Sequence, residues 1–378
     1  MKILLSVGDA SSDVYGAMLI KELKMLSPDI EIFANGGRLM ENAGAILLHN
    51  LVDLSVVGFY EAAKNYLKLK RIIKETASIA AREKIDKAVL MDYPGFNLLL
   101  SAELKKLGIP VYYYVTPQVW AWGKSRIMTI RKNFDLVLPI LPFEEKFFKE
   151  AGVNAEYFGN PLVGLVKSSK PKVELKKEFG LSADKKVIGL LPGSRKQEIL
   201  SLLPVMLETI KKLPGCEFIL GQAVSVSNEQ LKDVEGIKIV KDRAHDVMAV
   251  SDCLIAASGT VALEAAIMGT PAVIIYKVAP LTWFIGKRLI GFKYISLPNI
   301  ISGKLIYPEL LQKEANPGKI ASAVKTLLED KERLSQMQQE LLPIKASLGD
   351  GNSTAKVAKK ILNGPKDHVN IKVERRSN

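Results

Sequence analysis

The segment VIGLLPGSRKQEI, residues 187–199, decides the fold that this sequence predicts. An apolar run of strand type ends at Leu191, a Pro-Gly-Ser turn follows, and helical periodicity begins after Arg195. A tight turn from a strand into a helix presents backbone N–H groups and the positive end of the helix dipole, which favour an anion. The guanidinium of Arg195 matches a phosphate bidentately, so we expect Gly193, Ser194 and Arg195 to bind phosphate. The alternative is an ordinary strand-to-helix turn with a solvated arginine.

A second segment, DCLIAASGTVALE at 252–264, repeats this arrangement: a strand-like run enters Ser258-Gly259-Thr260 and a helix follows. Glu264 lies four residues after Thr260, on the same helix face and one turn deeper. A carboxylate there repels phosphate but accepts hydrogen bonds from vicinal hydroxyls such as those of a ribose. The two turns therefore predict a nucleoside diphosphate site. The alternative for Ser258 and Thr260 is simple helix capping.

Strand-like apolar runs alternate with helical periodicities along most of the chain, which predicts an α/β fold with parallel sheets covered by helices on both faces. The alternation relaxes at 166–177, VKSSKPKVELKK, which we interpret as a linker between two doubly wound, Rossmann-like halves. Ligands of such sheets bind beyond the carboxyl ends of the strands, so we expect the halves to face each other across a substrate cleft. The expected divisions are a first domain at 1–166, a second at 167–344, a helix at about 345–363 that returns to the first, and a charged tail at 364–378.

Composition limits the classes of function. The chain has 378 residues, enough for two cores, and a net charge of +13, which favours anionic partners. Two cysteines without CxxC spacing and three histidines argue for a reducing compartment and against a metal centre. We find neither a signal peptide nor an apolar run of about 18 residues, and expect a cytoplasmic protein that can attach to a membrane surface.

In the first half, the stretch KAVLMDYPGFN at 87–97 places Asp92 at the end of an apolar strand, directly before a helix that starts near Pro94. A carboxylate at the carboxyl end of a strand faces the expected cleft, where it can act as a general base. An unperturbed aspartate has a pKa of about 3.9, so this role requires partial desolvation by neighbours such as Tyr93 and Phe96. The alternative is that Asp92 is the N-cap of the helix.

Three further features have both a functional and a structural interpretation. The opening loop at 8–13, GDASSD, lacks GxGxxG spacing, so we expect no dinucleotide cofactor, and its Asp9 and Asp13 either contact substrate or cap a helix. The aromatic stretch at 112–126 is either core or a sugar platform. The segments at 51–74 and 281–294 mix aromatic, aliphatic and basic residues, which is typical of a helix on an anionic bilayer or of one packed on its own core.

Together these stretches resemble the lipid-A-disaccharide synthase family, from the first strand to about Leu362. The motifs that carry the resemblance are GDASSD with Gly16-Ala17, Gly36-Gly37, DYPGFN at 92–97, YVTPQVWAW at 114–122, LPFE at 141–144, LLPGSRKQEI at 190–199, ASGTVALE at 257–264 and SLPN at 296–299.

The resemblance implies a GT-B fold and inverting glycosyl transfer without a metal or other cofactor. UDP-2,3-diacylglucosamine would donate its sugar to 2,3-diacylglucosamine 1-phosphate (lipid X), giving the β-1,6-linked lipid A disaccharide and UDP. It also implies peripheral attachment to the cytoplasmic face of the inner membrane and, in many members, a homodimer. Nucleic acid is not an expected partner.

By motif, Asp92 resembles the base that deprotonates the acceptor 6-hydroxyl, and Arg195 resembles the ligand of the UDP phosphates. The donor pocket would comprise Gly193, Ser194, Arg195, Ser258, Gly259, Thr260, Glu264 and Asn299. The candidate substrate-loop residues are Asp9, Ser11, Asp13, Gln118 and Trp120. The candidate membrane patch comprises Val56, Val57, Phe59, Tyr60, Tyr66 and Leu67.

The chain departs from the family pattern at Asp9, Ser12 and Asn160, where the family usually has Glu, Gly and His. Roles that the family gives to those side chains are therefore not carried over. Two rival functions stay open from the residues: a UDP-sugar epimerase on the same fold, and a non-catalytic, membrane-bound module for nucleotide sugars. The epimerase would leave the membrane-type segments unexplained, and the module would have no need of Asp92.

Overall fold

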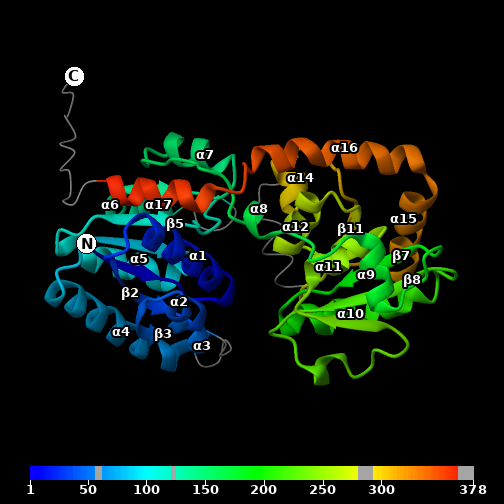
Figure 1. Cartoon of the computed structure of the whole chain (residues 1–378), viewed down its shortest axis with the longest axis horizontal. Helices are drawn as coiled ribbons and strands as arrows, with labels where there is room; N and C mark the ends of the chain where they lie inside the picture. Colours follow the sequence, from blue (N-terminus) through cyan, green and yellow to red (C-terminus); the bar gives the residue numbers. More distant parts are fainter. Residues whose placement is uncertain (56–61, 121–124, 280–292, 365–378) are drawn as a thin grey trace. The chain divides into compact units, whose positions relative to one another are not determined.

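The computed structural model describes residues 1–378 except 56–61, 121–124, 280–292 and 365–378 (Figure 1). The chain forms two compact units. The first comprises Met1–Pro161 and the chain from Gly349 onward, and the second comprises Leu162–Leu348. Each unit is built on one six-stranded sheet, so the predicted α/β class with two doubly wound parallel sheets is confirmed.

The sheet of the first unit has the strand order β3-β2-β1-β4-β5-β6, and all of its pairings are parallel. The central strands are buried on both faces, as their continuous apolar sequences require. The strands are β1 (Lys2–Ser6), β2 (Glu31–Gly36), β3 (Ile46–Asn50), β4 (Lys87–Met91), β5 (Val111–Tyr114) and β6 (Leu136–Leu138). The helices are α1 (Ala10–Leu26), α2 (Arg38–Asn42), α3 (Leu51–Ser55), α4 (Ala62–Arg82), α5 (Pro94–Lys106), α6 (Arg126–Asn133), α7 (Glu144–Glu150) and α17 (Ser353–Asn363).

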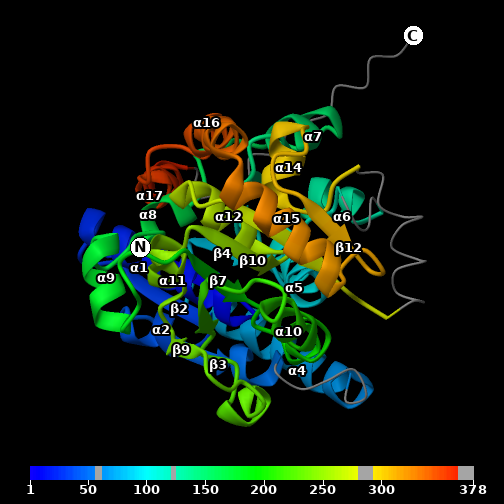
Figure 2. The ribbon, with the colours of Figure 1, turned by 90° about the vertical axis from the view of Figure 1, so that its right-hand side faces the viewer.

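The second unit repeats this topology with the strand order β12-β11-β10-β7-β8-β9, again all parallel. Figure 2 shows β7 and β10 next to each other, as their pairing requires. The strands are β7 (Val187–Leu191), β8 (Glu217–Gln222), β9 (Lys238–Lys241), β10 (Cys253–Ala257), β11 (Ala272–Tyr276) and β12 (Glu309–Leu311). The helices are α8 (Leu162–Leu165), α9 (Lys172–Phe179), α10 (Lys196–Ile210), η2 (Asn228–Leu231), α11 (Ala244–Val250), α12 (Thr260–Met268), α14 (Leu297–Ser302), α15 (Pro317–Glu329) and α16 (Lys331–Ser347).

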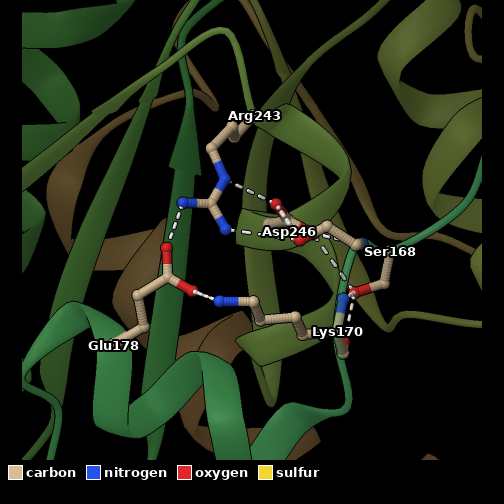
Figure 3. A network of polar contacts seen from close by, with 6 residues as sticks. Ser168, Lys170, Glu178, Arg243 and Asp246 are labelled. Atoms are coloured by element: carbon tan, nitrogen blue, oxygen red, sulfur yellow. Dashed lines mark hydrogen bonds and ion pairs between the residues drawn. The ribbon is translucent and has the colours of Figure 1, made fainter.

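The segment expected as a linker, 166–177, is only partly one, because α9 begins at Lys172. A polar cluster fixes this segment to α11 (Figure 3). Arg243 donates to Glu178 of α9 and, at 2.7 Å, to Asp246 of α11, whose carboxylate also accepts from the backbone of Ser169 at 2.7 Å. Hydrogen bonds from Arg243 and Lys170 lower the pKa of Glu178 to about 2. These charge-assisted contacts order the chain where the second unit begins.

Helix α17 belongs to the first unit, where it packs against α1. Its carboxyl end is closed by a buried lysine of β4: the ammonium of Lys87 donates to the carbonyl oxygens of Ile361, Leu362 and Gly364 at 2.7, 3.0 and 2.6 Å. The last carbonyl groups of a helix have no partner within it, and a cation also complements the negative end of its dipole. Lys87 therefore ties the returning helix to the central sheet.

We predict that Lys87→Met lowers the free energy of unfolding by about 2 kcal/mol or more, because buried carbonyl groups lose a charged donor. Urea unfolding of the full chain measures the loss, and amide exchange should increase across α17. Lys359→Met, on the exposed face of the same helix, is the matched control and should change stability by less than about 0.5 kcal/mol. Equal effects of the two substitutions would contradict the role of Lys87.

Candidate functional site

The two anion-binding turns predicted from the sequence follow neighbouring strands. Strands β7 and β10 pair in parallel, with Leu191 opposite Ala256, and the strand order of the second sheet reverses between them. Helices α10 and α12 begin directly after these strands. In open α/β sheets, ligands bind beyond the carboxyl ends of the strands at such a reversal. The structure thus brings both turns to the position where this topology binds ligands.

The turn before α10 is occupied by a carboxylate of its own helix. Glu198 accepts hydrogen bonds from the backbone N–H groups of Ser194 and Arg195 at 3.0 and 3.2 Å, and forms an ion pair with the Arg195 guanidinium at 3.1 Å. Gly193 permits this closure, since its φ is 106° and a Cβ there would lie 2.2 Å from the Glu198 carboxylate. The backbone amides expected to bind phosphate are therefore engaged, whereas the Arg195 side chain is 82% exposed.

The turn before α12 differs from the turn before α10 in that, within the described residues, no side chain caps the helix that follows it. This helix has nine residues, and its N-cap residue is Gly259. Ser258 donates its hydroxyl to the carbonyl of Ile295 at 3.3 Å, so it does not cap the helix as the structural alternative required. Gly259 and Thr260 are exposed. The amino-terminal end of α12 is therefore open to solvent at this edge of the sheet.

Glu264 lies one turn into α12 and is partly exposed. Its carboxylate is 3.7 Å from Nε2 of His245, the second residue of α11. Sequence reasoning did not select His245. The available signal was its position just after a strand, at the start of the helix that precedes β10.

Asn299 lies in the interior of the second unit and is fully buried. Its amide donates to the Tyr307 carbonyl and to Glu309, each at 2.8 Å, and accepts from the backbone of Ile306 and Tyr307. Glu309 in turn accepts from the backbone of Ser296. Its amide is thus committed to ordering the chain around α14, and the expected contact of Asn299 with the donor stays a prediction.

In the first unit, Asp92 follows β4, which pairs with β1 at the reversal of that sheet. Three residues at the ends of two neighbouring strands are strained: Asp92 and Tyr93 after β4 and Val115 after β5 have φ values of 42°, 45° and 54° in the left-handed region. The backbone N–H of Asp92 donates to the Val115 carbonyl at 2.9 Å, and the Asp92 carbonyl accepts from Asn97 at 2.9 Å. Such strain persists only where surrounding contacts impose it, and it concentrates at functional sites.

The structural alternative for Asp92 does not hold, because the N-cap residue of α5 is Tyr93. The Tyr93 ring packs so closely on the loop after β1 that a Cβ at Gly8 would lie 2.1 Å from it, and it stacks on Phe96 with ring centroids 5.9 Å apart. Burial raises the pKa of Tyr93. Asp92 itself is partly exposed, so it combines access to solvent with an aromatic neighbourhood.

The acidic residues of the opening loop both cap helices, and their expected contact with substrate stays a prediction. Asp9 is the N-cap of α1 and accepts from the backbone and hydroxyl of Ser12 at 2.9 and 2.8 Å. Asp13 is buried and accepts from the backbone N–H groups of Gly37 and Leu39 at 2.8 and 3.1 Å, so it caps α2. Ser11 is exposed.

In the aromatic stretch at 112–126, some of the described residues lie in the core and others on the surface. Trp120 is 8% exposed, its indole N–H donates to Glu144 at 2.7 Å, and its ring meets Phe143 edge-on. Gln118 is exposed. The structure therefore places Trp120 in the interior and leaves Gln118 on the surface of the same loop.

The expected membrane patch lies largely outside the described residues, which is the case for Val56, Val57, Phe59 and Tyr60. Tyr66 is within α4, and Leu67 on the same helix is 72% exposed. None of the helices in the described part of the chain is long and apolar enough to cross a membrane. In that part we also find no cluster of His, Cys, Asp or Glu that could hold a metal ion.

Comparison with known structures identifies the fold. UDP-GlcNAc 2-epimerase from Neisseria meningitidis, bound to UDP-GlcNAc, superposes with a TM-score of 0.67 at 14% identity, covering 96% of this chain and 100% of that one. The S. aureus MnaA–UDP co-structure gives 0.66 at 13% identity, with 95% of each chain covered. Both share the GT-B fold, and likeness at this identity shows the fold alone.

Sequence comparison identifies the family. The family model described as lipid-A-disaccharide synthetase matches residues 3–361. The lipid-A-disaccharide synthase of Trichlorobacter lovleyi is 38% identical over 377 residues, which cover 96% of this chain and 97% of that protein. The Myxococcus xanthus synthase is 37% identical over 370 residues, with 96% and 97% covered. The chain therefore belongs to the lipid-A-disaccharide synthase family of glycosyltransferases.

Proposed function

We propose that the protein transfers the sugar of UDP-2,3-diacylglucosamine to the 6-hydroxyl of 2,3-diacylglucosamine 1-phosphate, with inversion, giving the β-1,6-linked disaccharide and UDP. The observation that carries this proposal is that each sheet reverses its order next to residues suited to one half of the reaction. Anion-binding groups follow β7 and β10, and a carboxylate follows β4. The cleft expected from the sequence stays a prediction, and we propose that residues of both units act on one pair of substrates.

On the donor side, we assign the diphosphate to the Arg195 guanidinium and to the N-terminal amides of α12, at Gly259 and Thr260. These groups would stabilise the negative charge that develops on UDP as the glycosidic bond breaks. Glu264 would accept hydrogen bonds from the ribose hydroxyls, which its position one turn into α12 supports. Phosphate at the turn of Gly193 and Ser194 would have to share the amides of Ser194 and Arg195 with Glu198 or displace it.

On the acceptor side, we assign Asp92 as the general base that takes the proton of the 6-hydroxyl as it attacks the anomeric carbon. The strained backbone of Asp92 and Tyr93 supports this role, because it directs the carboxylate by rigid contacts. The nearby aromatic rings would desolvate the base once substrate is bound, which raises its pKa toward the working pH.

We further propose that the protein attaches peripherally to the cytoplasmic face of the inner membrane, and that it forms a homodimer. Exposed Leu67 on α4, followed by exposed Lys68, Lys70 and Arg71, supports the first proposal. Apolar contact combined with basic neighbours is the pattern that binds an anionic lipid surface.

We predict that purified protein converts the two lipid substrates into the disaccharide, and that Asp92→Asn lowers kcat by about 10²-fold or more because the base is lost. Mass spectrometry detects the product, and calorimetry should show UDP binding unchanged. Asp86→Asn, at the amino end of the same strand, is the matched control and should retain activity. Full turnover by Asp92→Asn removes Asp92 from the mechanism, and an epimerised free nucleotide sugar would indicate the epimerase instead.

We predict that Arg195→Ala weakens UDP binding about tenfold or more, since a charge-assisted contact to phosphate is lost. Isothermal titration calorimetry measures the dissociation constant. Lys196→Ala, an exposed neighbour at the first position of α10, is the control and should change it by about twofold at most. An unchanged dissociation constant in Arg195→Ala would show that the diphosphate binds elsewhere.

A further inference from the structure

A buried carboxylate of the first unit has no part in the mechanism described so far. Glu144, the first residue of α7, is 1% exposed. It accepts from the Trp120 indole at 2.7 Å, from the backbone N–H of Leu141 at 3.1 Å and from the Thr116 hydroxyl at 3.4 Å. All of these donors are neutral, so they compensate the burial of a charge only in part. Because burying the Glu144 carboxylate costs free energy, we looked for a role that its contacts could serve.

The contacts of Glu144 lead to Asp92. Thr116 directly follows Val115, whose left-handed backbone accepts the hydrogen bond from the Asp92 N–H. Glu144 therefore holds the loop at 116–120 from one side, while Val115 joins that loop to the strained strand end that carries Asp92. The chain just before Glu144 is fixed as well, because the buried amide of Asn160 donates to the carbonyl of Ile140 at 2.9 Å.

We propose that Glu144 is a positioning residue for glycosyl transfer, which fixes the loop at 116–120 and through Val115 the placement of Asp92. The inference rests on the proposed function for its effect on catalysis. Glu144 does not touch the reacting atoms in this account. It acts because left-handed residues return to ordinary backbone conformations unless their neighbours are held.

The titration of Glu144 offers a readout that is independent of catalysis. Burial raises the pKa of its carboxyl group from 4.5 to about 7. The folded state therefore binds more protons than the unfolded state between these values, so stability should fall as the pH rises through this window. Among the described residues, Tyr157 interacts electrostatically with Glu144, and burial raises the pKa of Tyr157, so that it stays neutral here. The neighbouring Glu145 is on the same helix and pairs with Lys149.

The test compares Glu144→Gln with Asp135→Asn, which is the same change from an acid to an amide. Asp135 directly precedes β6 and accepts a hydrogen bond from the N–H of Val111, at the amino-terminal end of β5 and away from Thr116. We expect kcat for disaccharide formation to fall about tenfold or more in Glu144→Gln, because small misplacements of a base are costly. The KM for the nucleotide sugar and the UDP dissociation constant should stay within about twofold. Asp135→Asn should retain kcat.

Trp120→Phe removes one donor and keeps the aromatic ring, so it separates positioning from packing. We expect a smaller fall in kcat than in Glu144→Gln, and no further fall in the double variant, since both changes act through one contact. The fall in stability between pH 4.5 and 7 should be reduced in Glu144→Gln.

The outcomes separate the two proposals. If the wild-type protein forms no disaccharide, the proposed function fails, and amide exchange of residues 112–120 then decides the positioning claim by itself: faster exchange in Glu144→Gln supports it and unchanged exchange overturns it. If the wild-type protein is active and Glu144→Gln retains its kcat, the inference fails while the proposed function stands.

Discussion

The reversal of strand order within each parallel sheet is the constraint on which the rest of this structure depends. On either side of the β7–β10 pair and of the β1–β4 pair, the strands that follow in the chain are added in opposite directions along the sheet. The space beyond the strand ends is thereby left to loops, helix N-termini and the side chains they carry. In the second unit these groups are the Arg195 guanidinium, which pairs with Glu198, and the N-terminal amides of α12, and in the first they centre on the Asp92 carboxylate. The same topology thus supports two different halves of one proposed reaction.

Local strain in the first unit depends on side chains that are far apart in sequence. Asp92, Tyr93 and Val115 adopt left-handed conformations that favour glycine. Asn97 holds the chain at Asp92, because its amide accepts from Ser6 and donates to the carbonyls of Met91 and Asp92. The absence of a side chain at Gly8 lets the Tyr93 ring pack on the loop after β1. This arrangement gives Asp92 a fixed position without making it part of the helix cap.

Periodicity was sufficient to predict the parallel architecture, because alternating strands and helices leave few topologies open. The second turn was also predictable, since Gly259 starts a helix that receives no side-chain cap in the described structure. The hydrogen-bond partners of individual side chains could not be predicted in the same way. Glu198 lies three residues after Arg195, a spacing typical of a capping box, yet its competition with phosphate was missed. Asn299 and Trp120 fit the family motifs, but their polar groups are satisfied in the interior by Glu309 and Glu144, which only tertiary structure reveals.

Similarity of structure identifies the fold of this chain, whereas similarity of sequence identifies its family. The fold is shared with a UDP-GlcNAc 2-epimerase at 14% identity, whereas relatives at 37–38% identity are disaccharide synthases, so only the sequence decides between these activities. The central claim is that the turns after β7 and β10 hold one diphosphate. Hydrogen exchange of the full chain with and without saturating UDP tests it most directly. The account predicts slower exchange in peptides covering both 192–199 and 257–264, with α17 unchanged. Unchanged exchange at both turns, with UDP bound, would contradict it.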